Sequence, residues 1–144
     1  MYSDSKSKTM ASQTKIITKG FSREAITRTA RAGVSTREIK KVSEAFNLSA
    51  TDIARVLGVN EKTVRNYQRQ EGRLSPQQGE QLLKYKQLRE RGTEVFGAKE
   101  AFDRWLHKPA YGLDGEMPVD LLVTSEGMNL VYDEVERIAN GEFA

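Results

Sequence analysis

The chain has 144 residues, of which 38% are hydrophobic and 30% charged, so it can form one ordinary domain or two small ones around a buried core. No apolar run approaches the roughly 20 residues that cross a bilayer, and there is no cysteine for a disulfide framework. The net charge is +3, but the two halves of the chain differ in sign. Through Arg73 there are 15 Lys and Arg against 7 Asp and Glu, whereas the acidic half from Leu74 onward has 8 Lys and Arg against 13 Asp and Glu. A basic half favours a polyanion such as nucleic acid, whereas the acidic half must face another partner.

Residues 1–20 are rich in Ser, Thr, Lys and Gln and contain few large apolar groups, so we expect them to form a disordered tail. The same segment lacks the apolar stretch of a signal peptide. Because the absence of cysteine also fits a reducing compartment, we expect a cytoplasmic protein without a membrane partner.

Helical signals then follow one another, and no segment has a convincing strand pattern. The first two helices are predicted in "SREAITRTARAG", which stops at Gly33, and in "STREIKKVSEAFNLS". The segment "SPQQGEQLLKYKQLRERG" predicts a helix that is capped by Ser75, has Pro76 at its first position and extends to Gly92. A further helical stretch, "TEVFGAKEAFDRWLHKP", carries an apolar stripe that ends before Pro109. The sequence therefore predicts an all-α fold.

The segment "ATDIARVLGVNEKTVRNYQR", residues 50–69, has the residue types of a helix-turn-helix at the required spacing. Ala54 is the small residue where the two helices cross, and Gly58 can take a positive φ at the turn. Ser49 and Asp52 form a candidate capping box, and Asn60 can cap the second helix. The apolar positions expected to pin both helices inward are Ile53, Leu57, Val59, Val64 and Tyr67.

The outward face of the second helix has side chains that read DNA, because Arg can grip guanine, Asn can pair with adenine and cations neutralise phosphate. The candidate DNA-binding residues are Thr51, Lys62, Thr63, Arg65, Asn66 and Arg69, with Arg73 as a further phosphate contact. Glu61 has two interpretations: it can complement the helix dipole, or it can repel phosphate and accept a hydrogen bond from cytosine. A helix-turn-helix that serves only the fold is the alternative to DNA binding.

The sequence offers little for catalysis or metal binding. His107 is the one histidine and there is no cysteine, so zinc sites and His- or Cys-based nucleophiles lack partners. We expect His107, at a helix end, to meet terminal carbonyls or solvent. The stretch "YGLDGE" predicts a turn rather than a nucleotide-binding loop, because no strand precedes it. We therefore expect no enzymatic activity, no cofactor and no metal.

The C-terminal segment predicts a short helix opened by Pro118 and a longer one capped by Thr124 or Ser125. Gly141 is expected to stop the longer helix. Its predicted inner stripe consists of Met128, Val131, Tyr132, Val135 and Ile138. The same pattern places Asp133, Glu134, Glu136 and Arg137 outward, with Leu130 stranded on the polar side.

The order of residues in this segment resembles the toxin-binding domain of the Xre/MbcA/ParS antitoxins, which carry a helix-turn-helix upstream. The resemblance rests on Trp105-Leu106, a Pro-containing loop, Leu113 with Gly115, Pro118, Leu121-Leu122, Thr124, Gly127, Val131, Ile138 and Gly141. Two positions depart from the family pattern: Asp114 stands where Gly is frequent, and Glu142 where a small apolar residue is common.

This resemblance implies an Xre-like helix-turn-helix domain over residues 21–92 and a toxin-binding domain over residues 93–144. It implies an antitoxin that covers the active site of a RES-domain toxin, an enzyme that degrades NAD⁺, and that represses its own operon. The candidate toxin-binding residues are Leu130, Asp133, Glu134, Arg137, Gly141, Glu142, Phe143 and Ala144. The implied partners are the toxin and operator DNA, and we expect a homodimer or a larger hetero-oligomer with toxin.

Two other classes of function stay open. One is a stand-alone transcription factor whose acidic half only dimerises, and the other is an enzyme that uses its carboxylates. For the tail, the hypothesis is that Glu142 and Phe143 enter the toxin's NAD⁺ site, and the alternative is that Phe143 packs on the antitoxin's own core.

Overall fold

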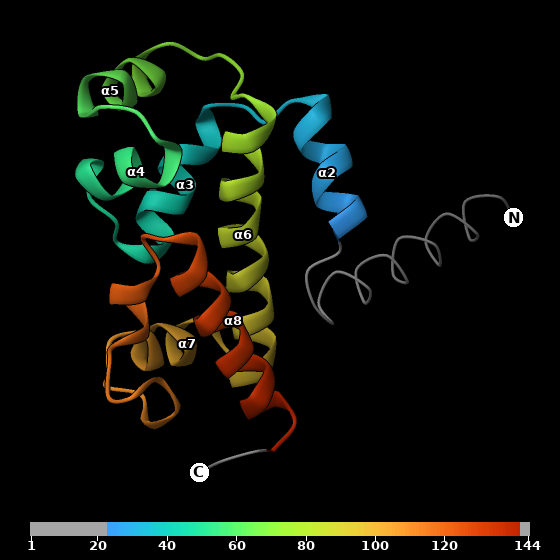
Figure 1. Cartoon of the computed structure of the whole chain (residues 1–144), viewed down its shortest axis with the longest axis vertical. Coiled ribbons are helices and arrows are strands. Elements are labelled where there is room, and N and C mark those ends of the chain that lie inside the picture. Colours follow the sequence, from blue (N-terminus) through green and yellow to red (C-terminus); the bar gives the residue numbers. More distant parts are fainter. Residues whose placement is uncertain (1–22, 142–144) are drawn as a thin grey trace, which may run out of the picture.

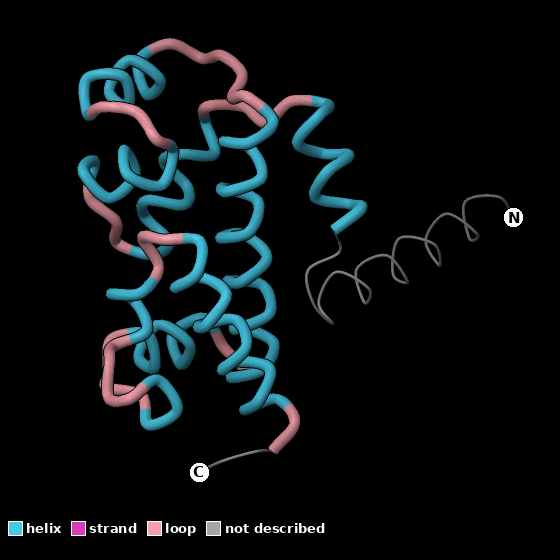
Figure 2. The backbone as a smooth tube through the Cα atoms, in the orientation of Figure 1, coloured by secondary structure: helices cyan, strands magenta, loops and turns pink. Residues whose placement is uncertain are grey.

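The computed structural model describes residues 23–141, so the predicted tail over residues 1–20 and the candidate residues Glu142, Phe143 and Ala144 lie outside the described residues. The described chain contains α2 (Arg23–Ala32), α3 (Arg37–Phe46), α4 (Ala50–Leu57), α5 (Glu61–Arg69), α6 (Pro76–Phe96), α7 (Lys99–Leu106), the 3₁₀ helices η1 (Tyr111–Leu113) and η2 (Pro118–Leu121), and α8 (Ser125–Ala139). Between residues 23 and 141 the only β pairing is an isolated bridge between Ser35 and Arg73. The predicted all-α fold is confirmed (Figure 2).

The long helix α6 organises the molecule. It runs along the length of the protein (Figure 1). Helices α3, α4 and α5 gather at one end of it, and α7, η1, η2 and much of α8 lie toward the other end. Helix α2 lies along the side of α6 that faces away from these helices. Helices α2, α3, α4, α7 and α8 all contact α6. One continuous buried cluster extends from Val34 in the N-terminal half to Val135 in α8. The predicted domain boundary after Gly92 falls within α6, so both halves use this helix.

The helix-turn-helix forms at α4 and α5 as predicted, and its local signals all operate. The Ser49 hydroxyl accepts from the Asp52 backbone N–H at 3.1 Å, and the Asp52 carboxylate accepts from the Ser49 N–H at 3.2 Å. The Asn60 side chain accepts from the Thr63 N–H at 2.8 Å and so begins α5. Gly58 ends α4 with a φ of +70°, which a glycine adopts without strain.

The end of α6 differs from the prediction, because the helix continues past Gly92 and stops at Gly97, whose φ is +86°. Gly92 is buried, and a Cβ there would overlap the ring of Phe102 on α7. The glycine therefore permits close packing of α7 on α6 instead of ending a helix. The predicted apolar stripe of residues 93–109 is divided between the two helices, which meet through the rings of Phe96, Phe102 and Trp105 at centroid distances of 5.3–6.0 Å.

Candidate DNA-binding and partner-binding surfaces

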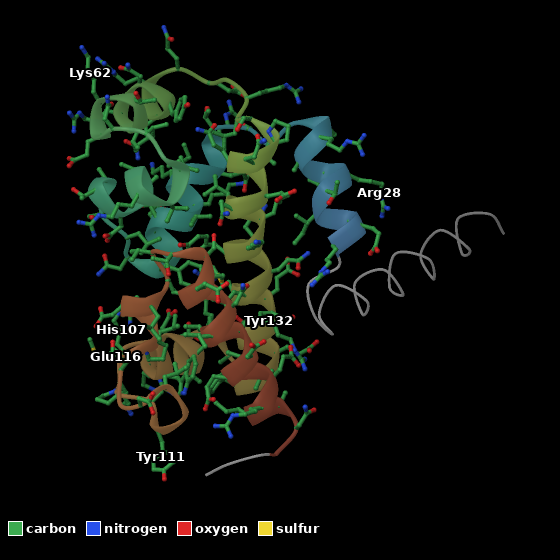
Figure 3. All side chains as sticks on the ribbon, in the orientation of Figure 1. Arg28, Lys62, His107, Tyr111, Glu116 and Tyr132 are labelled. Carbon is green, nitrogen blue, oxygen red and sulfur yellow. The ribbon has the colours of Figure 1, made fainter. Side chains whose placement is uncertain are left out.

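The outward face of α5 carries the predicted DNA-binding side chains at one end of the molecule. Val64 is fully buried on the inner side of the helix. The exposed side chains on the other side are Lys62, Arg65, Asn66 and Arg69, while Thr63 is half-buried. Lys62 projects away from the body of the protein at this end (Figure 3). Three cations and one amide thus share a surface that a DNA groove can reach.

Glu61 joins the first turn of α4 to α5. Its carboxylate accepts a hydrogen bond from the Thr51 hydroxyl at 2.8 Å and lies 3.8 Å from the Arg65 guanidinium. On the same helix, the Asn66 side chain accepts from the Arg69 guanidinium at 2.9 Å. These contacts hold Thr51 and Arg65 near one another. A base or phosphate that binds Arg65 or Thr51 must therefore compete with the Glu61 carboxylate, and one that binds Arg69 must compete with the Asn66 amide.

Two other residues considered from the sequence have local roles in the fold. The Arg73 guanidinium donates to the Ala32 carbonyl at 2.9 Å and crosses Gly33, so it holds the end of α2 to the segment before α6. The His107 ring nitrogen Nδ1 lies 2.9 Å from the Asp103 carbonyl at the end of α7. The expected contact of His107 with terminal carbonyls is thereby confirmed.

The second candidate surface is formed by α8. The Thr124 hydroxyl accepts from the Gly127 N–H at 3.0 Å and begins the helix, and Gly141 has a φ of +77° just beyond its last residue, Ala139. The inward stripe is confirmed for Met128, Val131, Tyr132 and Val135, all of which are buried, whereas Ile138 is only half-buried. Leu130 and Asp133 are exposed, as predicted.

The prediction that Glu134 faces outward is wrong, since only 8% of this residue is exposed. Its carboxylate accepts two hydrogen bonds from Arg137, from Nε at 2.9 Å and from Nη2 at 3.0 Å. The backbone of η1 covers the pair, because Gly112 approaches so closely that a Cβ there would overlap both side chains. A loop that is remote in sequence therefore covers part of the face that helical periodicity assigned to solvent.

Glu136 was also expected to face outward, but it is half-buried against α6. Its carboxylate accepts from Arg91 Nε at 2.6 Å and Nη2 at 2.9 Å. These hydrogen bonds raise the pKa of Arg91 above its ordinary value, while burial and then the Glu136 carboxylate raise the pKa of Tyr132. The hydrogen-bonded ion pair between Glu136 and Arg91 thus fixes the buried side of α8 on α6.

Tyr111 is a residue that the sequence reasoning missed. It lies in η1 and 84% of it is exposed, at the end of the molecule opposite Lys62 (Figure 3). The stretch "YGLDGE" predicts a turn, and the local signal for an exposed ring is the aromatic residue that stands inside this turn between Ala110 and Gly112.

Within the described range, no helix is long and apolar enough to span a membrane. Likewise, residues 23–141 contain no group of three or more His, Cys, Asp and Glu side chains arranged to hold a metal ion.

Comparison with known proteins assigns a domain to each surface. A family model described as the antitoxin Xre-like helix-turn-helix domain matches residues 25–85, and one described as the antitoxin Xre/MbcA/ParS C-terminal toxin-binding domain matches residues 91–141. Antitoxin Xre of Yersinia enterocolitica serotype O:8 / biotype 1B is 24% identical over 115 residues, covering 79% of this chain and 78% of that protein. The Prs ADP-ribosylating antitoxin of Sphingobium sp. strain YBL2 is 28% identical over 123 residues, covering 79% and 77%. The chain belongs to the Xre family of antitoxins, in which an Xre-like helix-turn-helix domain precedes an Xre/MbcA/ParS toxin-binding domain.

Proposed function

We propose that this protein is the type II antitoxin of a RES-domain toxin that degrades NAD⁺. In this proposal the antitoxin covers the toxin's active site through α8 and the residues that follow it. It represses its own operon through α5 and acts in the cytoplasm, where the operon and the NAD⁺ pool are located. The observation that carries the proposal is the separation of the two surfaces: the exposed cations of α5 lie at one end of α6, and the exposed part of the toxin-binding domain lies at the other.

The chemistry of the toxin is supported by the name of the Sphingobium relative, which links that protein to ADP-ribosylation. An ADP-ribosyl group comes from NAD⁺, and its transfer breaks the bond between nicotinamide and ribose. An enzyme that hydrolyses NAD⁺ breaks the same bond and transfers the group to water. Both reactions require a pocket that holds the pyrophosphate and the nicotinamide ring, so one mode of inhibition can serve either toxin.

For the DNA-binding half, we propose a homodimer on a two-fold operator. Helix-turn-helix proteins commonly read half-sites about 34 Å apart, which two copies of α5 could reach in successive major grooves. The candidate contacts are Lys62, Thr63, Arg65, Asn66 and Arg69 on α5 and Thr51 on α4. Glu61 discriminates against poorly aligned phosphate, since it already holds Thr51 and Arg65.

Co-expression with the adjacent reading frame tests the proposal. If that frame encodes the toxin, its expression alone should stop growth and deplete cellular NAD⁺, while co-expression with the antitoxin should restore both and yield a complex on purification. A neighbouring protein that is harmless and does not co-purify would instead favour a stand-alone regulator whose C-terminal half only dimerises.

Deletion of residues 141–144 tests whether the tail enters the toxin. Burying a Phe contributes roughly 1.5–3 kcal/mol, so the truncated chain should bind toxin about ten- to a hundredfold more weakly and fail to protect at limiting dose. The melting temperature of the free protein should remain nearly unchanged. Full neutralisation by the truncated chain would rule out entry of the tail into the toxin's active site. A large fall in melting temperature would show that Phe143 packs on the antitoxin itself.

A further inference from the structure

The toxin-binding domain exposes two large apolar side chains. Between residues 23 and 141 the exposed large hydrophobic residues are Tyr111, at 84%, and Leu130, at 51%. Both lie within the matched toxin-binding domain, one on η1 and the other on α8. Exposed aromatic and aliphatic groups on a structured surface are typical anchors of protein interfaces.

The loop that carries Tyr111 is held firmly by its own backbone. The Ala110 N–H donates to the Glu116 carbonyl, and the Gly115 N–H donates back to the Ala110 carbonyl, both at 3.0 Å. Ala110 and Leu113, on either side of the exposed ring, are buried in the core. A side chain presented by a fixed backbone loses little conformational freedom on binding, so more of its contact energy appears as affinity.

Gly112 fixes this loop against α8. Its φ is not positive, so the glycine is not needed for its backbone conformation. It is needed for close approach, because a Cβ would overlap the Glu134 carboxylate and the Arg137 guanidinium. Leu130 lies one helical turn before Glu134 on the same side of α8. The contact in which η1 rests on the Glu134–Arg137 pair therefore has Tyr111 next to its glycine in the chain and Leu130 one turn before its glutamate.

We infer that Tyr111 and Leu130 form an apolar anchor for the cognate toxin, and that the Glu134–Arg137 pair positions the loop that presents Tyr111. The identity of the partner as a toxin rests on the proposed function. Tyr111 lies at the end of the molecule opposite Lys62 of α5 (Figure 3). The exposed residues that follow Tyr111 in the chain include the carboxylates of Asp114 and Glu116, and Asp133 is exposed on α8, so this part of the domain would repel DNA. The surface fits a protein with an apolar depression bordered by cationic side chains.

The test measures affinity between the purified full-length antitoxin and the purified cognate toxin. Tyr111→Ala should weaken binding about ten- to a hundredfold and Leu130→Ala about tenfold, as expected for central apolar anchors. Tyr111→Phe, which keeps the ring, should bind within about threefold of the wild type. Lys108→Ala, an exposed change just before the loop, is the matched control and should leave the affinity unchanged.

Gly112→Ala examines the positioning role, since it keeps Tyr111 but forces η1 away from Glu134 and Arg137. It should weaken toxin binding about tenfold or more while operator binding stays at the wild-type level, which also reports that the chain remains folded. Wild-type affinity for Gly112→Ala would overturn the positioning role of the pair.

The possible failures are distinguishable. If the wild-type antitoxin does not bind the toxin, the proposed function itself fails. If the wild type binds and the Tyr111→Ala/Leu130→Ala double variant binds equally well, the anchor is wrong while the antitoxin function stands. Sedimentation of the free double variant supplies a third reading: a smaller mass than the wild type would mean that this surface joins two copies of the antitoxin, which would also overturn the inference.

Discussion

At the scale of single residues, α5 combines side chains that we propose read bases with a carboxylate that contacts one of them. The Arg65 guanidinium lies 3.8 Å from the Glu61 carboxylate, and the Asn66 side chain accepts a hydrogen bond from Arg69. The side chains of Arg65 and Asn66 therefore both have a partner within the protein in the absence of DNA. The exposed ion pair contributes at most about 1 kcal/mol, and a correctly placed guanine or adenine can replace these contacts. On the proposed function we expect discrimination between sequences, because an incorrect base would not replace the contacts that Arg65 and Asn66 lose.

Substitution of Arg65 or Asn66 by Ala should therefore weaken operator binding by about 1–3 kcal/mol and relax the sequence preference, with much less effect on random DNA. Lys62→Ala and Arg69→Ala should weaken binding to both DNAs more evenly and reduce its salt dependence, as expected for phosphate contacts. Titration of operator and random duplexes at several salt concentrations separates the two classes. Unchanged operator affinity in the Arg65→Ala/Asn66→Ala double variant would refute base reading by α5.

At the scale of elements, Glu38 joins α3 to α6. Its carboxylate lies 2.8 Å from the Lys86 ammonium on α6 and 3.4 Å from that of Lys41 on its own helix. Burial raises the pKa of Glu38, but the hydrogen bonds and charges of the two lysines outweigh it, so the pKa lies below its ordinary value of 4.5. The unfolded chain therefore binds the proton more readily than the folded protein does.

The lowered pKa of Glu38 in the folded protein predicts how stability depends on pH. The stabilisation by Glu38 is present above about pH 4.5 and is lost as the pH falls through the lowered pKa of the folded state. Glu38→Gln should lower the free energy of unfolding by about 1 kcal/mol or less at pH 7, and the difference from wild type should shrink below pH 4.5. Denaturant titrations across this range measure it, with exposed Glu44→Gln on the same helix as the control. A constant difference at all pH values would show that packing, not charge, is responsible.

At the scale of the whole molecule, α6 connects the DNA-binding end to the toxin-binding end. Gln78 donates to the Leu57 carbonyl of α4 at 3.3 Å, Gln81 to the Ser125 hydroxyl of α8 at 3.3 Å, and the Tyr85 hydroxyl to the Leu122 carbonyl. These side chains occupy successive turns of one helix, whose buried residues Leu82, Tyr85 and Leu88 belong to a continuous core. The two ends therefore share their stability even though their exposed surfaces are separate.

Substitutions on the exposed surfaces should accordingly affect either operator binding or toxin neutralisation, whereas substitutions in the shared core should reduce both. Arg65→Ala/Asn66→Ala should leave toxin neutralisation intact, and exposed changes after Pro118 should spare operator binding by the free protein. Leu82→Ala, at a fully buried position of α6, should cost about 2–5 kcal/mol and reduce both activities together. Growth rescue and operator binding, measured on folded variants, test this; loss of neutralisation in the Arg65/Asn66 variant would contradict it.

The sequence alone determined those features that depend on residues close together in the chain. Helical periodicity, the capping box of Ser49 and Asp52, the Asn60 cap and the Gly58 turn all act within a few residues, so their pattern specified the helix-turn-helix before any tertiary contact was known. The stripe from Met128 to Val135 predicted the buried face of α8 for the same reason.

Only the tertiary structure decided the features that depend on distant partners. Gly92 lies inside a helix because the Phe102 ring needs its space, and Glu134 is buried because Gly112 brings η1 over it. Tyr111 is exposed because its neighbours Ala110 and Leu113 occupy the core instead. A residue's exposure is set by which segment packs against it, and this packing joins positions that periodicity along the chain cannot relate.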